Sequence, residues 1–163
     1  MKNGLVALLI IFCATPVFAA TQATDGQAVE IFGRWWTRDK GAQIEIFPCA
    51  DRVCGRMAWI PHPDYPDGRP KLDDNNPDPA LRDRPLLGLP MLSGFAADAP
   101  GKWTGGQIYS ARRGKYYSAR LKLLSPDRLK VMGCFLIFCN GQTWQRVAPG
   151  EPAPEPAPEL SKE

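Results

Sequence analysis

The chain has 163 residues and a formal net charge of +3, a length that allows one domain and little more. Its 20 basic and 17 acidic residues are spread along the chain, whereas nucleic-acid-binding proteins gather their bases on one face or helix. Arg112, Arg113 and Lys115 form the one dense basic spot, which we interpret as a solvated turn. The composition therefore argues against nucleic acid as a partner.

Residues 1–20 have the order of a secretory signal peptide. Lys2 gives a positive start, an apolar run follows, and small residues close the segment. The apolar run is shorter than the about 20 residues of a membrane-spanning helix, so we expect cleavage near Ala19 or Ala20 and no transmembrane span. A retained anchor is the alternative, and lipidation of Cys13 is set aside because a bulky residue precedes it. These features predict a periplasmic protein.

The two ends of the remaining chain differ in composition from its body. Residues 21–30 are small and polar and predict a flexible leader before a β-barrel domain at 31–149. Residues 150–163 alternate proline with small or acidic residues. Proline fixes φ and removes a backbone donor, so we expect a disordered, extended Pro/Glu-rich tail that could also hold a partner.

The body of the chain has the residue pattern that is typical of antiparallel β proteins. Apolar and polar residues alternate over short runs, and Gly, Pro and Asp separate the runs. The short connections leave no room for parallel crossovers. We therefore predict an all-β fold of seven or eight antiparallel strands, either a barrel or a sandwich. The predicted strands cover residues 31–38, 43–47, 54–60, 103–110, 116–124, 128–134 and 143–147.

One long irregular stretch, residues 61–90, interrupts the strands. Its first third is too rich in proline for a central strand. Asp78 followed by Pro79 predicts an N-cap and first helical position, so a short helical turn should run to Arg82. Loops of this length are usually functional or disordered, and its leucines suggest that this one folds back onto the body.

Four cysteines follow the signal peptide, in two pairs with equal spacing: Cys49 with Cys54 and Cys134 with Cys139. An even number in an exported protein predicts disulfides, and three connectivities exist. If each pair flanks a tight hairpin turn, its side chains come within disulfide reach, so we favour two local bridges. A four-thiolate zinc site fits the spacing, but an oxidising compartment would consume the thiols, and we predict no metal.

Several motifs, taken together, resemble one family. The combination is similar to the exported bacterial family catalogued as domain of unknown function 2147, over about residues 31–147. The resemblance implies a lipocalin-like, calycin-type β-barrel of about eight strands in the cell envelope, and it implies no reaction. The motifs are a loop containing Asp73, Asn76, Arg82 and Gly88, then Trp103-x-Gly-Gly-x-Ile-Tyr109, Gly114-x-x-Tyr117 and Thr143-Trp144-x-Arg146-Val147.

The ends of the barrel region carry a further resemblance. Gly33-x-Trp35 and the late Arg146 resemble the closure of lipocalin barrels, in which a first-strand Trp packs under a last-strand Arg. A guanidinium stacked on an indole contributes about 0.5–2 kcal/mol, depending on how dry the site is. The resemblance therefore assigns these three residues to one closed end.

Catalytic and metal chemistry find little support in the sequence. His62 is the only histidine, stands between prolines, and has no evident nucleophile beside it. The acids between Asp73 and Asp78 lack the spacing of a calcium loop, and we interpret them as turn and capping residues. We therefore predict no catalytic residues, no cofactor and a protein that is not an enzyme.

The aromatic residues give the strongest indication of function, because such side chains line small-molecule pockets as well as cores. We predict a barrel that binds a small apolar or amphipathic ligand, with residues 61–90 as a lid. The wall candidates are Trp59, Arg84, Tyr109 and Arg120, the arginines meeting an acidic head group. An envelope protein–protein interaction module with a solid barrel core is the alternative, and an enzyme of unknown reaction comes third.

Overall fold

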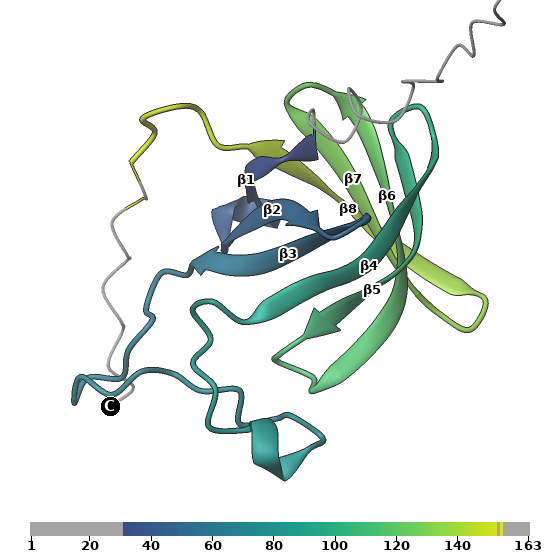
Figure 1. The fold of residues 1–163 in the computed structure, drawn as a ribbon. Helices are drawn as coiled ribbons and strands as arrows, with labels where there is room; N and C mark the ends of the chain where they lie inside the picture. The colour runs from purple at the N-terminus through teal and green to yellow at the C-terminus, as the bar shows by residue number, and fades with distance from the viewer. Residues whose placement is uncertain (1–30, 153, 155–163) are drawn as a thin grey trace, which may run out of the picture.

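The computed structural model describes residues 31–152 and residue 154 of the chain (Figure 1). The predicted signal peptide, the leader at 21–30 and most of the tail lie outside the described residues. In the described part, no helix has the length and apolar character needed to cross a membrane.

Eight antiparallel strands form a closed barrel in which each strand pairs with the next and β1 pairs with β8 (Figure 1). This confirms the all-β, lipocalin-like barrel, and the short 3-10 helices η1 (Arg38–Lys40) and η2 (Pro79–Leu81) are the helical elements among the described residues. The strands are β1 (Gly33–Trp36), β2 (Gln43–Cys49), β3 (Arg52–Trp59), β4 (Pro90–Ala99), β5 (Lys102–Ser110), β6 (Lys115–Ser125), β7 (Arg128–Phe135) and β8 (Phe138–Arg146).

Alternation along each strand decides which side chains fill the barrel. In β6, Ala119 and Leu121 are buried, whereas Arg120 and Lys122 between and after them are exposed, as the sequence pattern predicts. Large side chains from distant strands complete the core, which includes Phe95, Trp103, Leu129, Val131 and Trp144.

One end of the barrel is plugged. Trp35 is fully buried, and its indole N–H donates to the carbonyl of Ile31 at 2.8 Å. The guanidinium carbon of Arg146 lies 4.2 Å from the centre of the Trp35 ring, and Arg146 also donates to the carbonyl of Phe32 at 2.8 Å. Gly33 has φ of 119°, and a β-carbon there would lie 3.4 Å from a guanidinium nitrogen of Arg146. That distance is an ordinary contact, so it is the positive φ that favours glycine at this position.

Trp36 points the other way, out of the barrel, because adjacent residues of a strand face opposite sides. Its ring meets Trp59 edge-on at 5.5 Å. Its N–H donates to the carboxylate of Glu151 at 3.2 Å, and Lys40 binds the same carboxylate at 2.8 Å. The bonds from Lys40, the Ala148 N–H and Trp36 lower the pKa of Glu151 to about 2. The described start of the tail is thus held over Trp36.

The connection between β3 and β4 lies at the lower end of the barrel in Figure 1 and carries η2. Asp78 caps η2 by accepting from the N–H of Ala80, with Pro79 in the first position, which confirms the predicted helical turn. The sequence pattern predicts no strand at residues 90–99, where the structure has β4. Glycine and alanine are frequent there, and Gly94 has φ of 76°, so the alternation is weak and pairing with β3 and β5 determines the strand.

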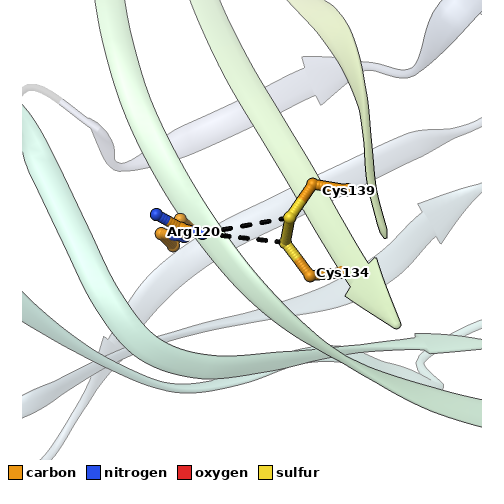
Figure 2. The surroundings of a disulfide bond; sticks show 3 residues. All are labelled: Arg120, Cys134 and Cys139. Atoms are coloured by element: carbon orange, nitrogen blue, oxygen red, sulfur yellow. Dashed lines mark hydrogen bonds between the residues drawn. A yellow bond between two sulfur atoms is a disulfide. The ribbon is translucent and has the colours of Figure 1, made fainter. Parts of the chain in front are cut away.

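The two disulfides are the local pairs, Cys49–Cys54 across the β2–β3 turn and Cys134–Cys139 across the β7–β8 turn. Cys134 and Cys139 are direct register partners. Cys49 pairs with Arg52, and Cys54 lies two residues farther along β3. A guanidinium nitrogen of Arg120 lies 3.9 Å from each sulfur of the second disulfide (Figure 2). The four cysteines of the described residues therefore all form structural links.

Candidate functional site

A cavity of about 750 Å³ opens at the end of the barrel opposite the Trp35 plug. Side chains from strands β2 to β8 and from the neighbouring connections line it. Its volume lies within the range of about 300–1,000 Å³ that is usual for small-molecule sites. Most of the wall is apolar, and the apolar lining residues include Ile44, Met57, Leu86, Met91, Ile108, Val131, Phe135 and Phe138.

The charged residues on this cavity all have one sign. Arg38, Arg112 and Arg113 line it, and no carboxylate does so among the described residues. Arg113 donates to the hydroxyl of Tyr117 at 3.4 Å and Arg38 to the carbonyl of Gly141 at 3.5 Å, both weak neutral partners. No ion pair within the described part of the chain neutralises these three side chains, which we call the rim arginines. They make the cavity attractive to an anion.

Trp144 carries an unusual buried polar group. The residue is 1% exposed and lines the cavity. Its indole N–H is buried and has no hydrogen-bond acceptor among the described residues. A buried donor without an acceptor is costly, about 1–3 kcal/mol, and calls for an explanation.

The structure brings one of the four predicted wall residues to the cavity. Tyr109 borders it, although its hydroxyl is turned toward Asp73. Trp59 packs on Trp36 outside the barrel, and Arg120 lies on the outer face against the disulfide (Figure 2). Arg84 lies in the β3–β4 connection. This placement differs from the expectation that Arg84 and Arg120 meet an acidic head group.

The predicted motif loop forms a buried polar network on the outside of the barrel wall. Asp73 and Asn76 are each 1% exposed. Asp73 accepts from the Tyr109 hydroxyl at 2.7 Å, from the Asn76 amide at 2.7 Å, and from Arg84 at 3.1 Å. Arg82 donates to the backbone carbonyl of Asn76 at 2.8 Å. Every partner is satisfied, so the network fastens the connection to β5 rather than offering a free binding group.

Gly88, the last residue of the motif loop, joins the other side of the connection to the barrel. Its N–H donates to the carbonyl of Met57 at 2.8 Å, and the N–H of Met57 donates to the carbonyl of Leu89 at 2.9 Å. Gly88 has φ of 83°, a conformation that favours glycine. Leu86 and Leu89 are thereby held against the core beside the cavity.

The network makes the attachment of the loop sensitive to alkaline pH. Burial, together with the hydrogen bond to the Asp73 carboxylate, raises the pKa of Tyr109 from 10.0 to about 12. Because the folded-state pKa is raised, this stabilisation is fully present below pH 10 and is lost as pH rises through about 12. We expect ultraviolet difference absorbance, compared with Tyr109→Phe, to show that the Tyr109 hydroxyl keeps its proton well above pH 10. Complete ionisation of Tyr109 by pH 10 would contradict this.

Gly114 lies at a second contact between the barrel and the β3–β4 connection. A β-carbon at Gly114 would collide with the carbonyl oxygen of Asn75, and φ is 59°. The amide of Asn75 donates toward the carbonyls of Ala111 and Arg112 at 3.4 Å. The β5–β6 turn, which carries two rim arginines, therefore packs directly on the connection.

Replacing Gly114 with alanine is expected to lower the free energy of unfolding by about 2 kcal/mol, combining backbone strain with displacement of Asn75. Gly105→Ala is the matched control, because φ is 72° there but a β-carbon would meet nothing within 4 Å. Its cost should be about 1 kcal/mol. Urea denaturation measures both, and equal losses would show that the packing on Asn75 contributes nothing.

Two groups of cavity residues were not singled out as a site from the sequence. Arg112 and Arg113, two of the rim arginines, belong to the basic cluster for which the sequence predicts only a solvated turn. Their position at the cavity follows from the topology, because the β5–β6 turn lies at the open end. Phe135 and Phe138 belong to the apolar residues between Cys134 and Cys139. This apolar segment is the sequence feature that could have indicated their role.

No cluster of three or more His, Cys, Asp or Glu residues that could hold a metal occurs in residues 31–152 and 154. His62 lies in the β3–β4 connection and does not line the cavity. The site is a cavity with an apolar wall and with arginines at its rim.

Comparisons with known proteins support the fold. A profile of the family described as "Uncharacterized protein conserved in bacteria (DUF2147)" matches residues 33–146. Among solved structures, the chain is similar to protein HP1028 from the human pathogen Helicobacter pylori, described as belonging to the lipocalin family. The identity is 24%, the TM-score is 0.63, and the match covers 73% of this chain and 84% of that one, which shows the shared fold. No curated protein matches the chain.

Proposed function

The chain belongs to the bacterial family of uncharacterized proteins DUF2147, and from this premise and its open barrel we propose that it binds a small amphipathic anion in the periplasm. The apolar part of the ligand lies among Ile44, Met91 and Val131. The anionic head lies at the rim arginines. Two disulfides support an oxidising compartment.

The observation that carries this proposal is the charge asymmetry of the cavity. An apolar wall alone would suit any hydrocarbon, but cations gathered at one rim select a molecule with a negative end. Charge-assisted hydrogen bonds from guanidinium groups to a carboxylate or phosphate are among the strongest in proteins. The rim arginines thus take the role that the sequence analysis gave to Arg84 and Arg120.

The size of the cavity bears on the choice between the two functional hypotheses. A volume of about 750 Å³ argues against the alternative of a solid barrel core. A binding protein therefore fits the geometry better than an interaction module that uses its surface alone.

Binding of a fluorescent fatty acid such as cis-parinaric acid tests the proposal. We expect saturable binding at one site, weakened about tenfold by Arg112→Gln combined with Arg113→Gln, since about 1.4 kcal/mol separates a paired from an unpaired head group. Arg128→Gln, an exposed arginine of β7 that does not line the cavity, is the matched control and should leave affinity unchanged.

A second variant tests the apolar wall. Gly133 lines the cavity, and a β-carbon there would make only ordinary contacts, 3.4 Å to Ile108 and 3.8 Å to Tyr117. Gly133→Leu should therefore fill part of the cavity and lower the affinity for the fatty acid at least tenfold. Unchanged affinity in Gly133→Leu, or equal affinity for the fatty acid and its neutral methyl ester, would overturn the proposal.

A further inference from the structure

The tip of the β7–β8 hairpin consists of four consecutive apolar residues. Phe135, Leu136, Ile137 and Phe138, which we call the hairpin tip, are 60%, 84%, 87% and 74% exposed. Singly exposed apolar residues are ordinary, but a contiguous exposed run marks an interaction site. The hairpin extends beyond the barrel at the lower right of Figure 1, in yellow-green. The hairpin tip therefore protrudes into its surroundings.

The backbone of this turn adds to the case. Two residues, Leu136 and Ile137, connect the strands, and Leu136 has φ of 55°. Glycine, asparagine and aspartate are the usual residues of two-residue hairpin turns, because they adopt positive φ at little cost. A leucine held in this conformation points to a requirement for its side chain. The disulfide Cys134–Cys139 links the strands directly behind the hairpin tip and holds it together.

The hairpin tip lies at the opening of the cavity. Phe135 and Phe138 are exposed and also line the cavity, so one apolar surface continues from the protruding turn into the barrel. The rim arginines line the same cavity, without a carboxylate in its described lining. An apolar wedge beside a group of cations is the combination that binds the surface of an anionic membrane.

We propose that this face of the molecule docks on an anionic phospholipid bilayer. The hairpin tip enters the boundary between head groups and acyl chains, and the rim arginines contact lipid phosphates. The docked barrel then presents its cavity to the membrane, so that an apolar tail can pass between bilayer and cavity along Phe135 and Phe138. Docking goes beyond the proposed ligand binding and does not require that the cavity be filled.

A bilayer suits this surface better than a protein partner. The hairpin tip is convex and made of four side chains, whereas a stable protein interface covers about 800 Å² on each partner. A wedge of this size is sufficient for membrane insertion, because each buried leucine or isoleucine side chain strengthens partitioning by about tenfold or more. The three rim arginines also match the negative charge of phosphatidylglycerol.

The test is co-sedimentation of periplasmically expressed protein with vesicles of phosphatidylethanolamine and phosphatidylglycerol. Leu136→Gly combined with Ile137→Ser removes the wedge and places glycine at the positive φ, so the hairpin should still fold, as circular dichroism will check. We expect partitioning to fall at least tenfold. Leu124→Ser, which removes a leucine that is 43% exposed on β6 and does not line the cavity, is the matched control and should change it less than twofold.

Two further measurements separate insertion from charge attraction. The introduced indole of Ile137→Trp should be quenched by brominated acyl chains, which requires insertion. Arg112→Gln combined with Arg113→Gln should lower partitioning about tenfold or more on anionic vesicles and leave weak binding to neutral phosphatidylcholine unchanged.

Several results would overturn membrane docking. They are equal partitioning of the Leu136→Gly, Ile137→Ser variant, no vesicle binding by the unmodified protein, and dimers in sedimentation velocity that disappear in that variant. Because vesicle binding is measured without the fatty-acid probe, failure here leaves the ligand proposal standing, and the reverse also holds.

Discussion

Replacing Asp73 with alanine is expected to lower the free energy of unfolding by about 3–4 kcal/mol and to release the β3–β4 connection from the barrel. The carboxylate is buried and accepts from Tyr109, Asn76 and Arg84. Removing it leaves the buried Tyr109 hydroxyl without an acceptor, at about 1–3 kcal/mol. It also takes one of two bonds from the Asn76 amide, which still donates to the Tyr109 hydroxyl at 3.2 Å. Arg84 adds less, because 34% of its side chain is exposed and water can solvate it.

The neighbouring carboxylate is the matched control for this experiment. Asp74 is exposed and accepts one hydrogen bond, from the Tyr65 hydroxyl at 3.3 Å, so Asp74→Ala should change stability by less than about 0.5 kcal/mol. Urea denaturation measures the free energy, and limited proteolysis shows whether residues 61–89 become accessible. If the two variants lose equal stability, the network does not fasten the connection.

Replacing Arg146 with methionine is expected to lower the free energy of unfolding by about 3 kcal/mol. Arg146 stacks on the fully buried Trp35, which contributes about 2 kcal/mol in a dry site. It also donates to the carbonyls of Phe32 and Pro126 at 2.8 and 2.6 Å. Hydrogen bonds from a charged donor contribute about 1.5–3 kcal/mol each, but the contributions of one side chain do not add fully. Methionine keeps much of the length and apolar packing of the side chain.

Arg128→Met is the control for Arg146, because Arg128 is exposed on β7 and neither stacks on Trp35 nor lines the cavity. Urea denaturation followed by tryptophan fluorescence measures both variants, and near-ultraviolet circular dichroism reports the environment of Trp35. A loss below 1 kcal/mol in Arg146→Met would mean that the plug is held by the apolar contacts of Trp35 alone.

The barrel could be predicted because alternation, turn residues and short connections all indicate the same fold, but β4 could not. In β4 the residues between Leu92 and Ala99 are mostly small, and Gly94 interrupts the pleat. Such a segment becomes a strand because β3 and β5 lie on either side of it, which is a property of the assembled barrel.

Some residues of the candidate site could likewise be predicted from the sequence, and others could not. Arg120 follows Ala119 and precedes Leu121, both buried, so alternation alone places it outside the barrel, and its assignment to the wall conflicted with the pattern. Arg84 is different, because its position depends on the path of a long irregular connection that no local pattern determines. The rim arginines become visible as a group only when the strand order brings the β1–β2 and β5–β6 turns to one end.

The seam between β1 and β8 has a consequence for how the barrel assembles. Every other pair of neighbouring strands is adjacent in sequence. Six of these pairings need only short loop closures and β3–β4 closes over residues 60–89, whereas Trp35 and Arg146 meet across most of the domain. Such distant closure is slow and entropically costly. The curled sheet of hairpins should therefore form first and be sealed last, where only two residue pairs join the strands. Arg146→Met should then act mainly by accelerating unfolding, because contacts made after the transition state affect that rate.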